Sequence, residues 1–176
     1  RQMTRLQNHV DFDRLPTRFR AVATDVTTGE MVVIGRGNLT DAIRASMAVP
    51  GAVNPVEING QLLIDGGVVR NLPVDVARSL GADVIIAVNI GTPLRTRNEL
   101  NTILGVSDQL TRILTVSNVN RSLAELGPQD LLIAPDLAAV STGDFDRLRE
   151  AASAGETATM AQVARLGTLG LDERAY

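Results

Sequence analysis

Short apolar runs bounded by polar residues, glycine or proline recur along this chain of 176 residues. The clearest runs are residues 62–64, 84–88 and 131–133, and their length and boundaries are typical of buried strands. Residues 84–88 carry no polar side chain, so we expect this strand to be covered on both faces, as strands of parallel sheets are. The pattern therefore predicts three buried strands.

A helix is predicted between the first two of these strands. Pro73 suits the first turn of a helix, where a missing N–H costs nothing, and Gly81 is a typical C-terminal cap. The succession of strand, helix and strand over residues 62–90 is the pattern of a crossover unit. We accordingly expect residues 62–64 and 84–88 to share one mostly parallel sheet with helices on both faces.

A β-hairpin is predicted near the beginning of the chain. Residues 19–25 and 30–35 have the composition of strands, and Gly29 ends the turn that connects them. Asp25 is interpreted as a turn-forming residue, with a polar group of a functional site as the alternative. A second tight turn is expected at residues 59–60, directly before the first apolar run.

Helical periodicity dominates the remaining segments. A short helix is expected over residues 42–48, and apolar residues at spacings of three, four and seven predict an amphipathic helix over residues 98–126 with a break near Gly105. A last helical region is expected from Asp144 into the 160s, interrupted at Gly155.

The composition limits the chemistry that the chain can perform. The formal net charge is −3 and aromatic residues make up only 2%, which leaves few platforms for stacking bases and argues against nucleic-acid binding. Cysteine is absent and His9 is the only histidine, so we expect no metal site. The chain has 44% hydrophobic residues and is long enough to form one domain with its own core. The sequence does not distinguish a cytoplasmic location from a secreted or outer-membrane-associated one.

Asp65, Gly66 and Gly67 form the most promising candidate site. They follow directly after the first apolar run, so a carboxylate is expected at the end of a strand. Two residues without side chains let a ligand or another backbone segment approach closely. Aspartate and glycine are also common turn residues, and a purely structural turn is the competing interpretation.

Several motifs along the chain stand out together. They are Thr24-Asp25, Thr28-Gly29-Glu30, Ile43-Arg44-Ala45-Ser46-Met47-Ala48-Val49-Pro50, Asp65-Gly66-Gly67 followed by Asn71 and Pro73, Leu131-Leu132-Ile133-Ala134-Pro135-Asp136, and Asp144-Phe145. These motifs resemble those of the patatin-like phospholipase family, in its bacterial and neuropathy-target-esterase-like branch, and the resemblance covers most of residues 19–160.

This resemblance implies a three-layer α/β/α sandwich with a mostly parallel sheet, incomplete in this chain. It also implies hydrolysis of membrane phospholipids or other fatty esters by a Ser–Asp dyad that needs no cofactor and no metal. The aspartate of the dyad corresponds to Asp65, which would act as general base, with Gly66 and Gly67 in the active-site loop. An ordinary aspartate has a pKa of ~3.9 and is a weak base, so the site must desolvate Asp65 or hold it close to the nucleophile.

The chain departs from the family at the nucleophile. The family's serine stands in Gly-x-Ser-x-Gly after a glycine-rich oxyanion loop, and neither motif occurs in this sequence. We therefore expect residues 1–176 to be the C-terminal part of one patatin-like domain, inactive alone, whose N-terminal part supplies the serine. Ser46 is interpreted as a packing residue near the site rather than as the nucleophile. The competing hypothesis is a non-catalytic α/β module, and self-association into a homo-oligomer stays open.

Overall fold

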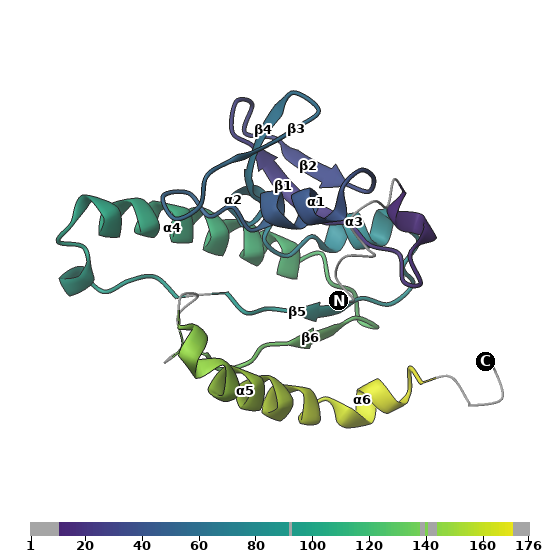
Figure 1. The fold of residues 1–176 in the computed structure, drawn as a ribbon. Coiled ribbons are helices and arrows are strands. Elements are labelled where there is room, and N and C mark those ends of the chain that lie inside the picture. Colours follow the sequence, from purple (N-terminus) through teal and green to yellow (C-terminus); the bar gives the residue numbers. More distant parts are fainter. Residues whose placement is uncertain (1–10, 92, 138–139, 141–143, 171–176) are drawn as a thin grey trace.

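The computed structural model describes residues 11–91, 93–137, 140 and 144–170, which form an α/β protein with two separate sheets (Figure 1). The first sheet has the strand order β2-β1-β4-β3, and each neighbouring pair is antiparallel. Its strands are β1 (Ala21–Asp25), β2 (Met31–Ile34), β3 (Val56–Ile58) and β4 (Gln61–Asp65).

Two hairpins build this sheet, and both turns follow the predicted chemistry. β1 and β2 pair from Ala21 opposite Ile34, and Gly29 in their turn has a φ of 74°. Between β3 and β4, Asn59 and Gly60 have φ values of 53° and 78°. Positive φ at both central residues matches the twist of the flanking strands, so the predicted hairpin and the predicted turn at residues 59–60 are confirmed.

The main core lies between the antiparallel sheet and helix α1 (Leu39–Ser46). Phe12, in the short 3-10 helix η2 (Phe12–Arg14), is completely buried in this core. The other buried members of the cluster are Ala21, Ala23, Ile34, Leu39, Ala42, Ala45, Val56 and Leu63. His9 lies outside the described residues.

The second sheet consists of β5 (Ile86–Val88) and β6 (Leu131–Ile133), which pair in parallel. The long helix α4 (Ile103–Leu123) lies between them in the chain, so the crossover unit is β5-α4-β6. Helix α3 (Val74–Ser79) and α4 cover the inner face of this sheet, where the buried cluster consists of Leu72, Val74, Ile85, Ala87 and Val119.

The prediction that residues 62–64 and 84–88 share one parallel sheet is therefore wrong. β4 lies between β1 and β3, so both of its edges are already occupied by hairpin strands and neither is open to β5. The strand at 84–88 is also not covered on both faces. Ile86 is 49% exposed and Val88 51% exposed, whereas Ala87 is buried. The mixed α/β class with a parallel sheet is confirmed, but its crossover comes one unit later in the chain.

The helices differ from the prediction mainly at their ends. α4 begins at Ile103 behind a Thr102 cap, preceded by η3 (Arg97–Glu99), and Gly105 lies inside its first turn. The last region contains η4 (Phe145–Arg147), α5 (Leu148–Met160) and α6 (Val163–Gly167), and α5 runs through Gly155 without interruption. None of the helices described is long and apolar enough to cross a membrane.

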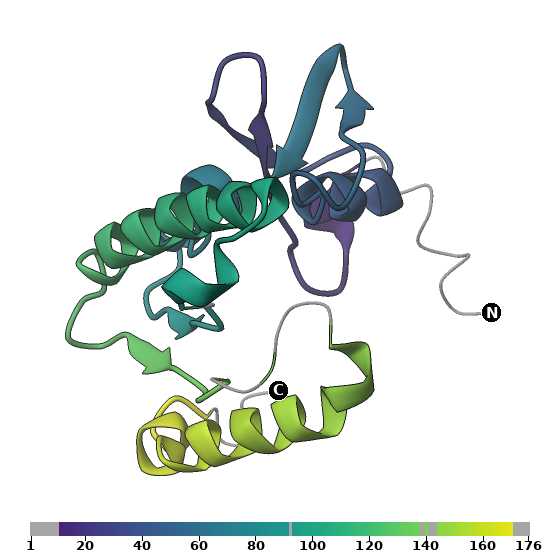
Figure 2. The same ribbon diagram turned by 90° about the vertical axis from the view of Figure 1, so that its left-hand side faces the viewer.

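These elements are arranged in levels that both ribbon views show. The antiparallel sheet with α1 lies at one end, and α5 and α6 lie at the opposite end (Figures 1 and 2). Helix α4 and the parallel strands lie between them. A short helix α2 (Gly67–Arg70), which the sequence patterns did not predict, connects β4 to α3 and packs against α4.

Candidate active site

Asp65 is the last residue of β4, as predicted, and its backbone is held from two sides. Its N–H donates to the carbonyl oxygen of Ala48 at 3.0 Å, and its carbonyl oxygen accepts from the Thr24 hydroxyl at 2.9 Å. Ala48 follows α1 and Thr24 belongs to β1. The chain segments on either side of β4 thus fix the position from which the carboxylate projects.

The two oxygens of the Asp65 carboxylate have different environments. Oδ1 accepts a hydrogen bond of 2.6 Å from the N–H of Gly67, whereas Oδ2 accepts none from the residues that the structure describes. Burial raises the pKa of Asp65, and the hydrogen bond from Gly67 acts in the opposite direction. The carboxylate is half-buried, so it can still reach solvent or a substrate. One oxygen is therefore held in place while the other is free to accept a proton.

The two glycines after Asp65 are required by space. A Cβ atom on Gly66 would lie 2.2 Å from the carbonyl oxygen of Val22 in β1. A Cβ atom on Gly67 would lie 2.7 Å from Oδ1 of Asn71 and 2.9 Å from Oδ1 of Asp65. The φ of Gly66 is −66°, a value that any residue adopts, so close approach rather than backbone freedom explains the glycine here.

Asp65 opens onto a hollow of about 210 Å³. Ser46 lines the same hollow, together with two arginines that form ion pairs with other carboxylates. Arg20 pairs with Asp13, and Arg70 pairs with Asp75 at 2.7 Å and with Glu125 at 3.2 Å. The full lining is Arg20, Val22, Ser46, Asp65, Gly66, Gly67, Arg70, Asn71 and Pro73. The sequence predicted Ser46 near the site but not the arginines, of which Arg20 lies 45 positions before Asp65 and Arg70 five positions after it.

Asp25 is a turn residue, in agreement with the preferred interpretation. Its Oδ1 accepts hydrogen bonds from the Thr27 N–H at 2.9 Å and from the Thr27 hydroxyl at 2.7 Å, and Gln61 donates to Oδ2. The hydrogen bonds from Thr27 lower the pKa of Asp25. This carboxylate is a weaker base than an ordinary aspartate, and its hydrogen-bonding capacity is used within the hairpin turn.

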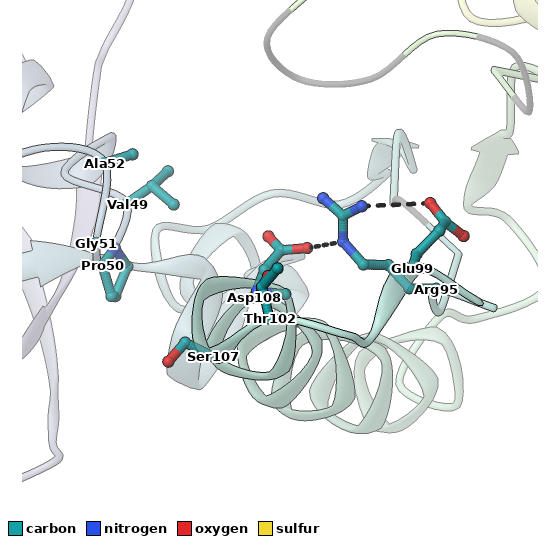
Figure 3. A pocket seen from close by; sticks show the side chains of 10 residues that line it. Val49, Pro50, Gly51, Ala52, Arg95, Glu99, Thr102, Ser107 and Asp108 are labelled. Atoms are coloured by element: carbon teal, nitrogen blue, oxygen red, sulfur yellow. Dashed lines mark hydrogen bonds and ion pairs between the residues drawn. The ribbon is translucent and has the colours of Figure 1, made fainter. Parts of the chain in front are cut away.

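A larger hollow of about 380 Å³ separates the segment 49–52 from the first turns of α4 (Figure 3). Figure 3 shows Arg95 between two carboxylates of this hollow, with Nε 2.6 Å from Asp108 and a terminal nitrogen 3.2 Å from Glu99. Burial raises the pKa of Asp108, but hydrogen bonds from Arg95 and Arg112 outweigh it, so that the pKa is lowered overall. The charged side chains of this hollow are therefore paired with one another.

The carboxylates with shifted pKa values thus differ in a way that singles out one candidate base. Among the described residues, the pKa is raised for Asp65 and lowered for the other shifted carboxyl groups. The lowered ones are Asp13, Asp25, Glu99, Asp108 and Asp130. A general base is more effective when its pKa lies closer to neutrality. No group of three or more histidine, cysteine, aspartate or glutamate residues in the described part of the chain could hold a metal ion.

The comparisons with known proteins point to one family. Residues 3–78 match the family model described as patatin-like phospholipase. An uncharacterized NTE family protein of Mycobacterium tuberculosis is 44% identical over 81 residues, which cover 46% of this chain and 22% of that protein. A second NTE family protein of the same organism is 28% identical over 170 residues, covering 85% of this chain and 29% of its own length.

An animal protein is also similar to this chain. The "Patatin-like phospholipase domain-containing protein 7" of Mus musculus is 46% identical over 74 residues, which cover 41% of this chain and 6% of that protein. The chain thus spans less than a third of the length of each of these relatives.

Proposed function

We propose that this chain belongs to the patatin-like phospholipase family and is part of an enzyme that hydrolyses lipid esters, with Asp65 as the general base. The observation that carries this proposal is the environment of the Asp65 carboxylate. Burial raises its pKa, and Oδ1 is held by Gly67 while Oδ2 accepts no hydrogen bond from the described residues. This combination suits a group that must take up a proton and release it again.

In the proposed reaction Oδ2 of Asp65 accepts the proton of a serine hydroxyl as the serine oxygen attacks the ester carbonyl carbon. The ester C–O bond then breaks, and Asp65 passes the proton to the departing alkoxide, which leaves an acyl-serine. The same carboxylate then takes a proton from a water molecule as the water oxygen attacks the acyl carbon. It passes this proton to the serine oxygen as the acyl–oxygen bond breaks, which releases the fatty acid and the free serine. No metal and no cofactor takes part in these steps.

We propose that the substrate is a membrane phospholipid or another fatty ester. None of the seven serines of the chain stands in Gly-x-Ser-x-Gly, so the proposed nucleophile and oxyanion hole lie in a segment outside these 176 residues. Ser46 is the alternative nucleophile, because it lines the same hollow as Asp65. The structural alternative, a non-catalytic module in which Asp65-Gly66-Gly67 is only a turn, remains the second candidate.

The test is the Asp65→Asn variant of the full-length protein, assayed with a fluorogenic lipid ester with and without chelator. Asparagine is nearly isosteric and its oxygen can still accept the Gly67 N–H, so the melting temperature should be maintained. Removal of the proton acceptor should lower turnover by ~10²–10⁴-fold, which is the usual contribution of a general base. Asp25→Asn is the matched control and should cost much less activity, because the Asp25 carboxylate accepts hydrogen bonds within the hairpin turn.

Four results would contradict parts of this proposal. A stable Asp65→Asn protein with unchanged turnover would make Asp65 a turn residue and would favour the non-catalytic module. Activity that disappears with chelator would overturn the metal-free mechanism. A stable but inactive Ser46→Ala variant, or ester hydrolysis by residues 1–176 alone, would place the nucleophile within this chain.

A further inference from the structure

We infer that Asn118 of helix α4 is a positioning residue that holds Asp65 in its reactive orientation by clamping helix α2. This inference rests on the proposed role of Asp65 and adds a residue to the same site. Asn118 is 53 positions from Asp65 along the chain and does not line the hollow. A series of hydrogen bonds connects α4 through α2 to the carboxylate.

Asn118 is 5% exposed and uses both ends of its side-chain amide on α2. Its Oδ1 accepts the N–H of Asn71 at 2.9 Å. Its Nδ2 donates to the carbonyl oxygen of Gly67 at 2.9 Å and to that of Val68 at 3.3 Å. Thr115, one turn earlier on α4, donates its hydroxyl to the same Gly67 oxygen at 3.0 Å. The carbonyl group of Gly67 thus receives donors from two α4 side chains.

This clamp stands where a backbone hydrogen bond of α2 would otherwise form. In an α-helix the N–H of residue i donates to the carbonyl of residue i−4, and Arg70 does so to Gly66 at 2.8 Å. The next pair would be Asn71 with Gly67, but both of these groups bond to the Asn118 amide instead. An amide side chain carries a donor and an acceptor, like a peptide group, so it can join the two.

The clamped residue is the one that orients the catalytic carboxylate. The N–H of Gly67 donates to Oδ1 of Asp65, while the carbonyl of Gly67 is held by α4. Glycine has more backbone freedom than any other residue, so without the clamp the Gly67 N–H would be less firmly directed. Asn118 and Thr115 remove this freedom, and the carboxylate is held with Oδ2 available. A displacement of about 1 Å at a reacting group can cost about 10²-fold in rate.

The critical substitution is Asn118→Asp in the full-length protein. A carboxylate of the same shape would face the carbonyl oxygens of Gly67 and Val68 and could donate to neither of them. We expect kcat to fall about 10- to 100-fold with KM changed less than about twofold, because Asn118 does not line the hollow. Asn120→Asp is the matched control. It makes the same charge change on the exposed side of the same helix and should leave kcat unchanged.

A second pair of variants keeps Asn118 and tests the hydrogen bond that the Thr115 hydroxyl donates to the Gly67 carbonyl. Thr115→Val removes one donor to Gly67 at nearly constant shape, and Thr115→Ser retains it. We expect kcat to fall several-fold in Thr115→Val and to be restored in Thr115→Ser, with the melting temperatures of all variants measured in parallel. This pair carries the test if Asn118→Asp does not fold.

A folded Asn118→Asp protein with normal kcat would overturn the inference, as would equal kcat values for Thr115→Val and Thr115→Ser. A purely structural role predicts lower melting temperatures with turnover of the folded fraction unchanged. The result for Asp65→Asn separates the two proposals. If Asp65→Asn is inactive while the Asn118 and Thr115 variants are normal, only the positioning role fails. If Asp65→Asn is fully active, the proposed function itself fails.

Discussion

Replacement of Gly66 by alanine tests the close approach between the candidate site and strand β1. The backbone at Gly66 has φ −66° and ψ −23°, which alanine adopts without strain, so any effect must come from the added methyl group. This methyl carbon would lie 2.2 Å from the carbonyl oxygen of Val22 and 2.6 Å from its carbonyl carbon. Non-bonded heavy atoms normally stay about 3.5 Å or more apart, so one backbone must move by roughly 1 Å.

The neighbouring strand has little room for such a movement. All five residues of β1 are buried, and β1 is hydrogen-bonded to β2 on one side and to β4 on the other. Overpacking of a core costs about 1–3 kcal/mol, and we expect about 3 kcal/mol because the clash is with backbone. For a chain of this size each kcal/mol lowers the melting temperature by about 2–4 °C, which predicts a decrease of roughly 6–12 °C.

Thermal unfolding followed by circular dichroism measures this decrease. Gly155→Ala is the matched control, because Gly155 lies inside α5 and no atom lies within 4 Å of its added Cβ. Alanine is the better helix former by about 1 kcal/mol, so this control should melt at the same temperature or slightly higher. If Gly66→Ala melts within about 2 °C of the unmodified protein, the reasoning from the Val22 contact is refuted.

Two further predictions use the same measurements. Gly67→Ala would place a methyl group 2.9 Å from Oδ1 of Asp65, so we expect a displaced carboxylate and lost turnover with a smaller thermal effect than Gly66→Ala; normal turnover would contradict this. Asp130→Ala should lower the melting temperature, because Asp130 accepts the N–H groups of Gly127 at 2.7 Å and Ile85 at 2.8 Å, which lower its pKa. Because the pKa of Asp130 is below its ordinary value of 3.8, the ionised carboxylate stabilises the folded protein above pH 3.8. This stabilisation is lost as the pH falls through the lowered pKa of the folded protein. The thermal difference between Asp130→Ala and the unmodified protein should therefore be largest near neutral pH and narrow in acid, and a difference independent of pH would refute the assignment.

Local turn chemistry made much of the fold predictable. Gly29 and the Asn59-Gly60 pair indicate two hairpins, and both are present. Sheet membership was not predictable in the same way, because it depends on which strand edges are left open. The pairing of β1 with β4 joins the two hairpins and closes both edges of β4, and no spacing within residues 62–90 reveals this.

The candidate site was predictable only in its local part. Asp65, Gly66 and Gly67 could be singled out because a strand end and two glycines coincide in the sequence. Arg20 of the hollow and the clamp from α4 depend on contacts between distant segments, so they could not be derived from the motif. The sequence contained one indication of the clamp, within the helix predicted over residues 98–126. Thr115 and Asn118 lie three positions apart on one helix face, which is unusual for a surface that packs on other elements.

The exposed outer face of β5 has a practical consequence for the behaviour of the isolated chain in solution. In the part of the chain that the structure describes, β5 pairs only with β6, and the carbonyl of Ile85 and the N–H of Asn89 bond to that neighbour. The peptide groups of Ile86 and Val88 therefore point away from β6, beside apolar side chains that are about half exposed. An open, apolar strand edge is a template for another strand, so β5 is a predicted site of edge-to-edge aggregation of this chain.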